Sequence, residues 1–186
     1  RIGLLSADLR THSVAYFIEP IIEHLDRSRF EVLAYSARGG EDATSHRLRG
    51  KCDAWRTMTL DSEAEIARAV RSDGVDVLIE LGGLTSGSSL PVLRFRPAPA
   101  QATYCGYPNT TGLRDVGFRL VDALTDPAGP SASEGGGEGG SGTAADDAQR
   151  RCVERLVRLE PCFLCYRPPE AGLALSTARA PGEGVV

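Results

Sequence analysis

The first residues that could do chemistry lie in a polar loop, residues 8–13, between an apolar run and a helical pattern. His12 stands near the end of this loop. Its ring nitrogens can exchange protons near neutral pH, and the N-terminus of the following helix can hold negative charge. The position suits proton transfer or the binding of a charged group, and it equally suits a polar surface residue beside a helix cap. His24 and His46 fall on predicted helix surfaces and are expected to be solvated.

A second candidate is the segment "RPAPAQATYCGYPNTTG", residues 96–112, in which prolines and glycines flank a short apolar run. Proline fixes φ and removes a hydrogen-bond donor, whereas glycine opens backbone space that other residues cannot enter. The segment is therefore predicted to form a turn, a strand and a second turn. A backbone fixed so firmly forms either a structural corner or a wall of a binding site.

Other motifs carry weaker signals. The run from Gly82 to Gly87 resembles a phosphate-binding loop but lacks the lysine and the spacing of one. Cys162 and Cys165 have the spacing of half a zinc site or of a redox pair. Because no second ligand pair accompanies them, a buried strand is the favoured interpretation. Paired acids that hold a divalent ion are absent outside a low-complexity insert, so we expect no metal and no cofactor.

Strand and helix patterns alternate along the chain and predict an α/β fold with a largely parallel sheet. Residues 14–25 recur at helical spacing, with Thr11 or Ser13 as the cap and a kink or break near Pro20. The predicted strands are Ile2–Leu5, Phe30–Tyr35, Trp55–Leu60 and Val75–Leu81, and further helices are expected over 42–49 and from Asp61. Ligands bind beyond the carboxyl ends of such strands, which nominates the loops 8–13, 82–89 and 106–112.

Composition limits the function classes. The chain has 186 residues, enough for one domain with a sizeable core, with 41% hydrophobic residues and a net charge of −4. The acidic balance argues against a nucleic-acid surface, and no apolar run is long enough to span a bilayer. Five cysteines, an odd number without a secretory signal, predict reduced thiols in the cytoplasm or nucleus.

The chain divides into four predicted parts. Residues 1–128 form the main lobe, and residues 129–150, rich in Gly, Ser and Glu, form a disordered insert. Residues 151–172 complete the lobe, with a helix over 153–159 and a strand over 163–166, and residues 173–186 form an exposed linker. Because the chain begins with Arg1 in a strand pattern and stops after the linker, we expect a fragment of a longer protein.

Five stretches follow one another in order: "HSVAYFIEP", "FEVLAYSA", "RPAPAQATYCGYPNTTGL", "ALTDP" and "VERLVRLEPCFLCYRPPEAG". Together they closely resemble the SPINDLY family of protein O-glycosyltransferases and, more loosely, the O-GlcNAc transferases. The resemblance implies a Rossmann-like lobe, the first half of a GT-B glycosyltransferase, with tetratricopeptide repeats before it and a second lobe after it. It implies sugar transfer to Ser or Thr of nuclear and cytoplasmic proteins, with fucose from GDP-fucose preferred over GlcNAc from UDP-GlcNAc.

The resemblance also implies site residues. Asp8 and His12 match the family's D-x-x-x-H loop, with His12 as a proton relay or as a positioning group. The family's G-Y-P-x-T-x-G loop beside the donor sugar is matched by Gly106, Tyr107, Pro108, Thr110, Thr111 and Gly112.

Two residues depart from the patterns of these relatives. Leu84 replaces the histidine of a Gly-His-Thr sequence, so any polar role there is lost. Trp55 stands roughly where O-GlcNAc transferases carry a second histidine, which favours the SPINDLY side. The lobe by itself is expected to be inactive. The rival interpretations are a non-catalytic protein-binding lobe and a stand-alone domain that binds some other nucleotide.

Overall fold

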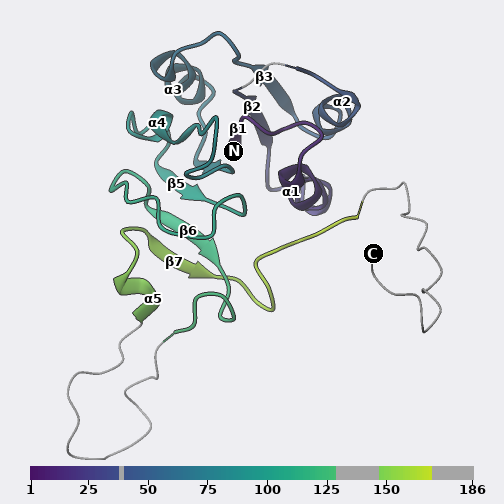
Figure 1. Ribbon diagram of the computed structural model, residues 1–186. Coiled ribbons are helices and arrows are strands. Elements are labelled where there is room, and N and C mark those ends of the chain that lie inside the picture. Colours follow the sequence, from purple (N-terminus) through teal and green to yellow (C-terminus); the bar gives the residue numbers. More distant parts are fainter. Residues whose placement is uncertain (38–39, 129–146, 169–186) are drawn as a thin grey trace, which may run out of the picture.

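The computed structural model describes residues 1–37, 40–128 and 147–168, which contain a seven-stranded sheet (Figure 1). Its neighbouring strands all pair in parallel, in the order β3-β2-β1-β4-β5-β6-β7. The strands are β1 (Ile2–Ser6), β2 (Val32–Ser36), β3 (Ala54–Thr57), β4 (Val77–Glu80), β5 (Ala100–Thr103), β6 (Phe118–Val121) and β7 (Arg155–Arg158). The predicted α/β fold with a parallel sheet is confirmed.

Helices cover both faces of the sheet. On one face, α1 (Ser13–His24) and α2 (Ala43–Arg49) pack apolar side chains against β1 and β2. On the other, α3 (Glu63–Ser72) and α4 (Leu90–Leu93) pack against the same strands and β4. The short α5 (Asp147–Arg150) packs beside β6 and β7. Strands covered on both faces need apolar side chains on both, which explains the near-continuous apolar runs of the sequence.

The direction in which the sheet grows reverses between β1 and β4. The chain first adds β2 and β3 on one side of β1, and then adds β4 to β7 on the other side. Leu5 of β1 is in register with Glu80 of β4, and Glu80 is in register with Thr103 of β5. The loops after these three strands therefore leave the sheet at one edge, where open parallel sheets bind their ligands.

The helix α1 runs through Pro20 without interruption, so the break that was one of the two predicted outcomes does not occur. Proline has no N–H, which frees the carbonyl four residues earlier, that of Tyr16. The backbone N–H of Arg167 donates to this carbonyl at 2.9 Å. The proline is tolerated because a segment distant in sequence supplies the missing hydrogen bond.

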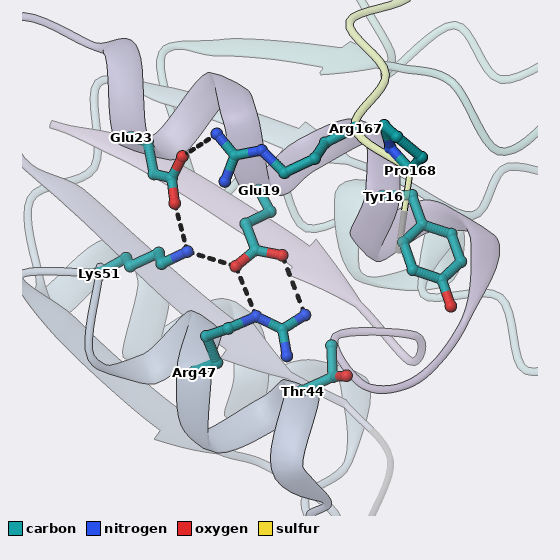
Figure 2. Close-up of a pocket in the computed structure, with 8 residues that line it drawn as sticks. All are labelled: Tyr16, Glu19, Glu23, Thr44, Arg47, Lys51, Arg167 and Pro168. Carbon is teal, nitrogen blue, oxygen red and sulfur yellow. Dashed lines mark hydrogen bonds and ion pairs between the residues drawn. The ribbon is translucent and has the colours of Figure 1, made fainter. Parts of the chain in front are cut away.

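Residues 163–168, which we call the strap, leave the sheet and cross α1. The Phe163 carbonyl accepts a hydrogen bond from the Tyr104 hydroxyl at 2.8 Å, and the Tyr166 ring lies 5.3 Å from the Phe17 ring, centre to centre. At its end the Arg167 guanidinium pairs with Glu23 (Figure 2). The strap is not a strand, and Cys162 and Cys165 are exposed. The prediction of a buried strand was therefore wrong: Phe163 packs against Tyr104 and Tyr166 packs against α1.

The region around the predicted insert also differs from expectation. The strand β7 lies where a helix over 153–159 was predicted, because a short apolar run fits both spacings and the parallel pairing with β6 decides. Residues 147–150, assigned to the insert from sequence, form α5. The rest of the insert, 129–146, and the linker 173–186 lie outside the described residues.

Two features are absent from the described ranges. No helix there is long and apolar enough to cross a membrane. No three His, Cys, Asp or Glu side chains in those ranges are grouped so that they could hold a metal ion.

Candidate functional site

A cavity of about 300 Å³ lies at the switch point of the sheet. Its walls come from the loop after β1, the loop after β4 and the start of the loop after β5. The lining residues are Asp8, Arg10, His12, Ser13, Val14, Gly82, Thr85, Ser86 and Gly106. The structure thus brings the three nominated loops together, and it places Asp8, His12 and Gly106 of the predicted site residues in one cavity.

His12 is the N-cap of α1, where Thr11 or Ser13 was expected. Its backbone is extended, and its ring Nδ1 accepts a hydrogen bond from the Val14 N–H at 3.2 Å. Thr11 is engaged elsewhere, since its N–H donates to Asp42 at 2.7 Å. A neutral imidazole that accepts at Nδ1 carries its proton on Nε2. In this arrangement the remaining polar atom of His12 is a hydrogen-bond donor.

Asp8 lies between the two basic side chains of the loop. One carboxylate oxygen is 3.9 Å from Nδ1 of His12 and the other is 3.5 Å from a terminal nitrogen of Arg10. The Asp8 side chain is largely buried in the wall of the cavity and is 11% exposed. Both distances exceed those of strong charge-assisted hydrogen bonds. Asp8 therefore places a negative charge beside Arg10 and His12 without a strong hydrogen bond to either.

Glu80, the last residue of β4, holds the Gly82 end of the turn that lines the cavity, and it was missed by the sequence analysis. It is fully buried, and its two carboxylate oxygens accept the N–H groups of Gly82 at 3.0 Å and Gly83 at 2.7 Å. Burial raises the pKa of Glu80 to about 7, although these N–H groups act in the opposite direction. The available signal was an acid at the last position of the most apolar strand.

Two glycines allow the backbone of the site to close. A Cβ at Gly106 would lie 2.0 Å from the Leu81 carbonyl oxygen. A Cβ at Gly83, whose φ is +58°, would lie 2.2 Å from Cβ of Tyr107. Neither position has room for a side chain, so the loops after β4 and β5 meet only because both are glycine.

The rest of the loop 106–112 points away from this cavity. Glu154, fully buried before β7, accepts hydrogen bonds from the Thr110 hydroxyl at 2.6 Å and from the Thr111 N–H at 2.7 Å, and also from the Thr111 hydroxyl. Tyr107 and Pro108 line a separate cavity of about 40 Å³, and Gly112 is exposed. The threonines anchor the loop from within, a contact that sequence patterns could not reveal.

The remaining histidines and Trp55 lie outside the cavity. His24 and His46 are exposed, as predicted. Trp55 is in β3, on the outer edge of the sheet, where the Arg49 guanidinium lies 5.3 Å from its ring centre. Leu84 is 54% exposed and neighbours Thr85 of the cavity wall.

Comparison with known families decides what this lobe is. Residues 1–134 match the model of glycosyl transferase family 41. The chain belongs to this family. The predicted resemblance is thereby confirmed, and the cavity at the switch point lies within the part of the chain that carries the family 41 match.

Several family 41 relatives are similar over most of the chain. It is 42% identical, over 92% of its length, to a probable UDP-N-acetylglucosamine–peptide N-acetylglucosaminyltransferase SPINDLY of Arabidopsis thaliana. It is 32% identical, over 68% of its length, to a UDP-N-acetylglucosamine–peptide N-acetylglucosaminyltransferase of Caenorhabditis elegans. The chain spans 17% of the first relative and 11% of the second.

A solved structure of an O-GlcNAc transferase mutant from Thermobaculum terrenum superimposes with a TM-score of 0.80 at 35% identity. The match covers 95% of this chain and 31% of that one. The Rossmann-like lobe of a GT-B glycosyltransferase, expected from the sequence, is confirmed by this likeness.

Proposed function

We propose that this chain is the N-terminal catalytic lobe of a protein O-glycosyltransferase. The enzyme would transfer a sugar from a nucleotide-sugar to Ser or Thr hydroxyls of nuclear and cytoplasmic proteins. The observation that carries the proposal is the cavity at the switch point, which collects Asp8 and His12 from one loop and Gly106 from another. Family membership and the activities named for its relatives support the same reaction class.

In this reaction the acceptor hydroxyl attacks the anomeric carbon and loses its proton while the nucleotide diphosphate leaves. The geometry favours His12 as a donor that positions the sugar or the acceptor, because Nδ1 already accepts the Val14 N–H and Nε2 carries the proton. Among the lining residues that the structure describes, Asp8 is the one carboxylate. We assign to Asp8 the acceptance of the hydroxyl proton, directly or through a water molecule.

The donor we propose is GDP-fucose, with UDP-GlcNAc as the alternative. Trp55 in place of a second histidine supports fucose, whereas the printed names of the relatives support GlcNAc. We propose that the reaction needs no metal, since no divalent-ion motif was found in the sequence outside the insert. The groups that bind the leaving diphosphate are expected on a second lobe.

The test uses the full-length protein that contains this lobe, an acceptor protein or peptide, and each nucleotide-sugar in turn, with mass spectrometry as the readout. A deoxyhexose increment establishes fucosyl transfer, and an N-acetylhexosamine increment establishes the alternative. Replacing His12 by Ala should reduce either transfer at least about 100-fold.

His46→Ala is the matched control, because His46 is exposed on α2 outside the cavity. It should leave transfer unchanged. If neither donor gives a product with substrates that the family accepts, the lobe is a non-catalytic protein-binding module.

A further inference from the structure

One cationic side chain in the cavity lacks a strong partner. Arg10 lines the cavity together with Asp8 and His12, and its side chain is 36% exposed. Its one acceptor among the described residues is the Asp8 carboxylate at 3.5 Å. Its Nε is enclosed by protein and has no hydrogen-bond partner in the described part of the chain. A guanidinium carries five donors in a planar fork, so most of its binding capacity is unused.

Several other donors near Arg10 are already engaged. The N–H groups of Gly82 and Gly83 donate to Glu80, and the Val14 N–H donates to His12. The Thr85 hydroxyl donates to the Gly82 carbonyl. The N–H groups of Gly82 and Gly83 are therefore not available to a diphosphate, and the Val14 N–H in the first turn of α1 is capped by the protein itself.

What the cavity offers is a single planar cation, with the hydroxyls of Ser13 and Ser86 on the same wall. A guanidinium fork matches the two oxygens of one carboxylate, and such bidentate pairs are among the stronger hydrogen-bonded contacts. Asp8 leaves room for this contact, because its carboxylate lies deeper than the guanidinium and is 11% exposed.

We propose that Arg10 determines acceptor specificity by binding the carboxylate of an Asp or Glu close to the Ser or Thr that receives the sugar. This inference rests on the proposed transfer to protein hydroxyls, and it adds the class of acceptor sequence. Arg10 takes no part in the bond-breaking step.

The experiment compares matched acceptor peptides with the full-length protein. Each peptide carries one Thr, with Glu, Gln or Lys at one neighbouring position in turn. For the wild type, kcat/KM should be about tenfold higher for the best Glu peptide than for its Gln counterpart, equivalent to about 1.4 kcal/mol. Arg10→Gln should abolish this preference, and Arg10→Glu should shift it toward the Lys peptide. The KM for the nucleotide-sugar should not change.

Arg68→Gln serves as the control, because Arg68 is an exposed arginine on α3, over the opposite face of the sheet. It should keep the preference for Glu. A wild type that does not distinguish Glu from Gln overturns the proposal. So does an Arg10→Gln variant that keeps the preference, or one whose only change is a higher KM for the nucleotide-sugar, which would assign Arg10 to the diphosphate.

Peptide binding, measured by fluorescence anisotropy without transfer, separates this proposal from the proposed function. If no sugar is transferred but the Glu peptide binds more tightly than the Gln peptide in an Arg10-dependent way, the subsite stands and the transfer proposal fails. If sugar is transferred but neither binding nor kcat/KM differs between the Glu and Gln peptides, the proposed transfer is supported and the proposed role of Arg10 is wrong. Equal melting temperatures of wild type and Arg10→Gln exclude a folding defect as the cause.

Discussion

Two polar cavities lie along α1, and they differ in how their charges are satisfied. The first, of about 220 Å³, lies against the strap and is lined by Tyr16, Glu19, Glu23, Thr44, Arg47, Lys51, Arg167 and Pro168 (Figure 2). Glu19 there accepts two hydrogen bonds from Arg47, at 2.7 and 3.0 Å, and pairs with Lys51. Glu23 pairs with Lys51 and Arg167.

These contacts lower the pKa values of both glutamates. Arg47 and Lys51 hold the pKa of Glu19 below its usual range in spite of burial, and Arg167 and Lys51 lower the pKa of Glu23 to about 2. In the cavity at the switch point, by contrast, Arg10 and the Nε2 of His12 keep donors without a protein acceptor in the described structure. The cavity beside the strap is therefore charged, but its charges are paired with one another. The cavity at the switch point keeps donors that a ligand could engage, and this distinguishes it as the candidate binding site.

The largest effect should come from removing the His12 donor while keeping its cap. Asp and Asn are both good N-cap residues, but only Asn also carries an N–H donor. We expect His12→Asp to reduce kcat/KM about 100- to 1000-fold and His12→Asn about tenfold, measured by sugar transfer. Similar melting temperatures would show that the cap is intact. Equal losses in the two variants would show that a donor at this position is unimportant.

The next effect concerns Glu80, which accepts the N–H groups of the turn beside the cavity. Because the pKa of Glu80 is raised to about 7, the folded protein keeps a proton that the unfolded chain releases above about pH 4.5. Its contribution to the free energy of unfolding should therefore fall as pH rises from about 4.5 to 7, by up to about 3 kcal/mol. Urea unfolding across this range should show that fall in the wild type and lack it in Glu80→Gln. Parallel curves for the two proteins would contradict the prediction.

A variant that removes a charge from the cavity beside the strap should lower the stability and leave catalysis intact. Glu19→Gln removes a buried charge that two cations share, which should lower the free energy of unfolding by about 2 kcal/mol. The loss is kept moderate because the Arg47 side chain is 43% exposed and can be solvated. Sugar transfer per folded molecule should stay within about twofold of wild type. A large loss of transfer would mean that the two cavities are coupled through α1.

The smallest effect should come from the strap, and two variants separate its contacts. Arg167→Ala removes the ion pair with Glu23, which is partly exposed and should contribute little to the free energy of unfolding. That contribution is present above the ordinary pKa of Glu23 and is lost as pH falls toward 2. Arg167→Pro also removes the N–H that reaches Tyr16 and should cost about 1 kcal/mol more. Equal stabilities of the two variants would show that this hydrogen bond does not stabilise the fold.

The sequence predicted the parts of the molecule that depend on local pattern. The alternating apolar runs indicated the parallel sheet, and the rule on strand ends placed Asp8, His12 and Gly106 at one edge. The role of the His12 ring could not be predicted in the same way. It depends on the backbone angles that make His12, and neither Thr11 nor Ser13, the N-cap.

The remaining differences from prediction depend on contacts between segments that are distant in sequence. Pro20 is tolerated because Arg167 supplies a donor, and Thr110 and Thr111 turn inward because Glu154 accepts from them. Glu80 has its partners nearby in sequence, but its burial follows from the strands on both sides of β4. Such contacts form only when the sheet is assembled.

The hydrogen bond from Arg167 to the Tyr16 carbonyl also fixes the register of the strap on α1. Pro20 frees one carbonyl in the middle of α1, so the strap has a single main-chain anchor there, and a slip by one residue would leave that carbonyl unpaired. The anchor lies four residues beyond His12, close to one helical turn. The strap and the ring that caps α1 are therefore held by the same helix, about one turn apart.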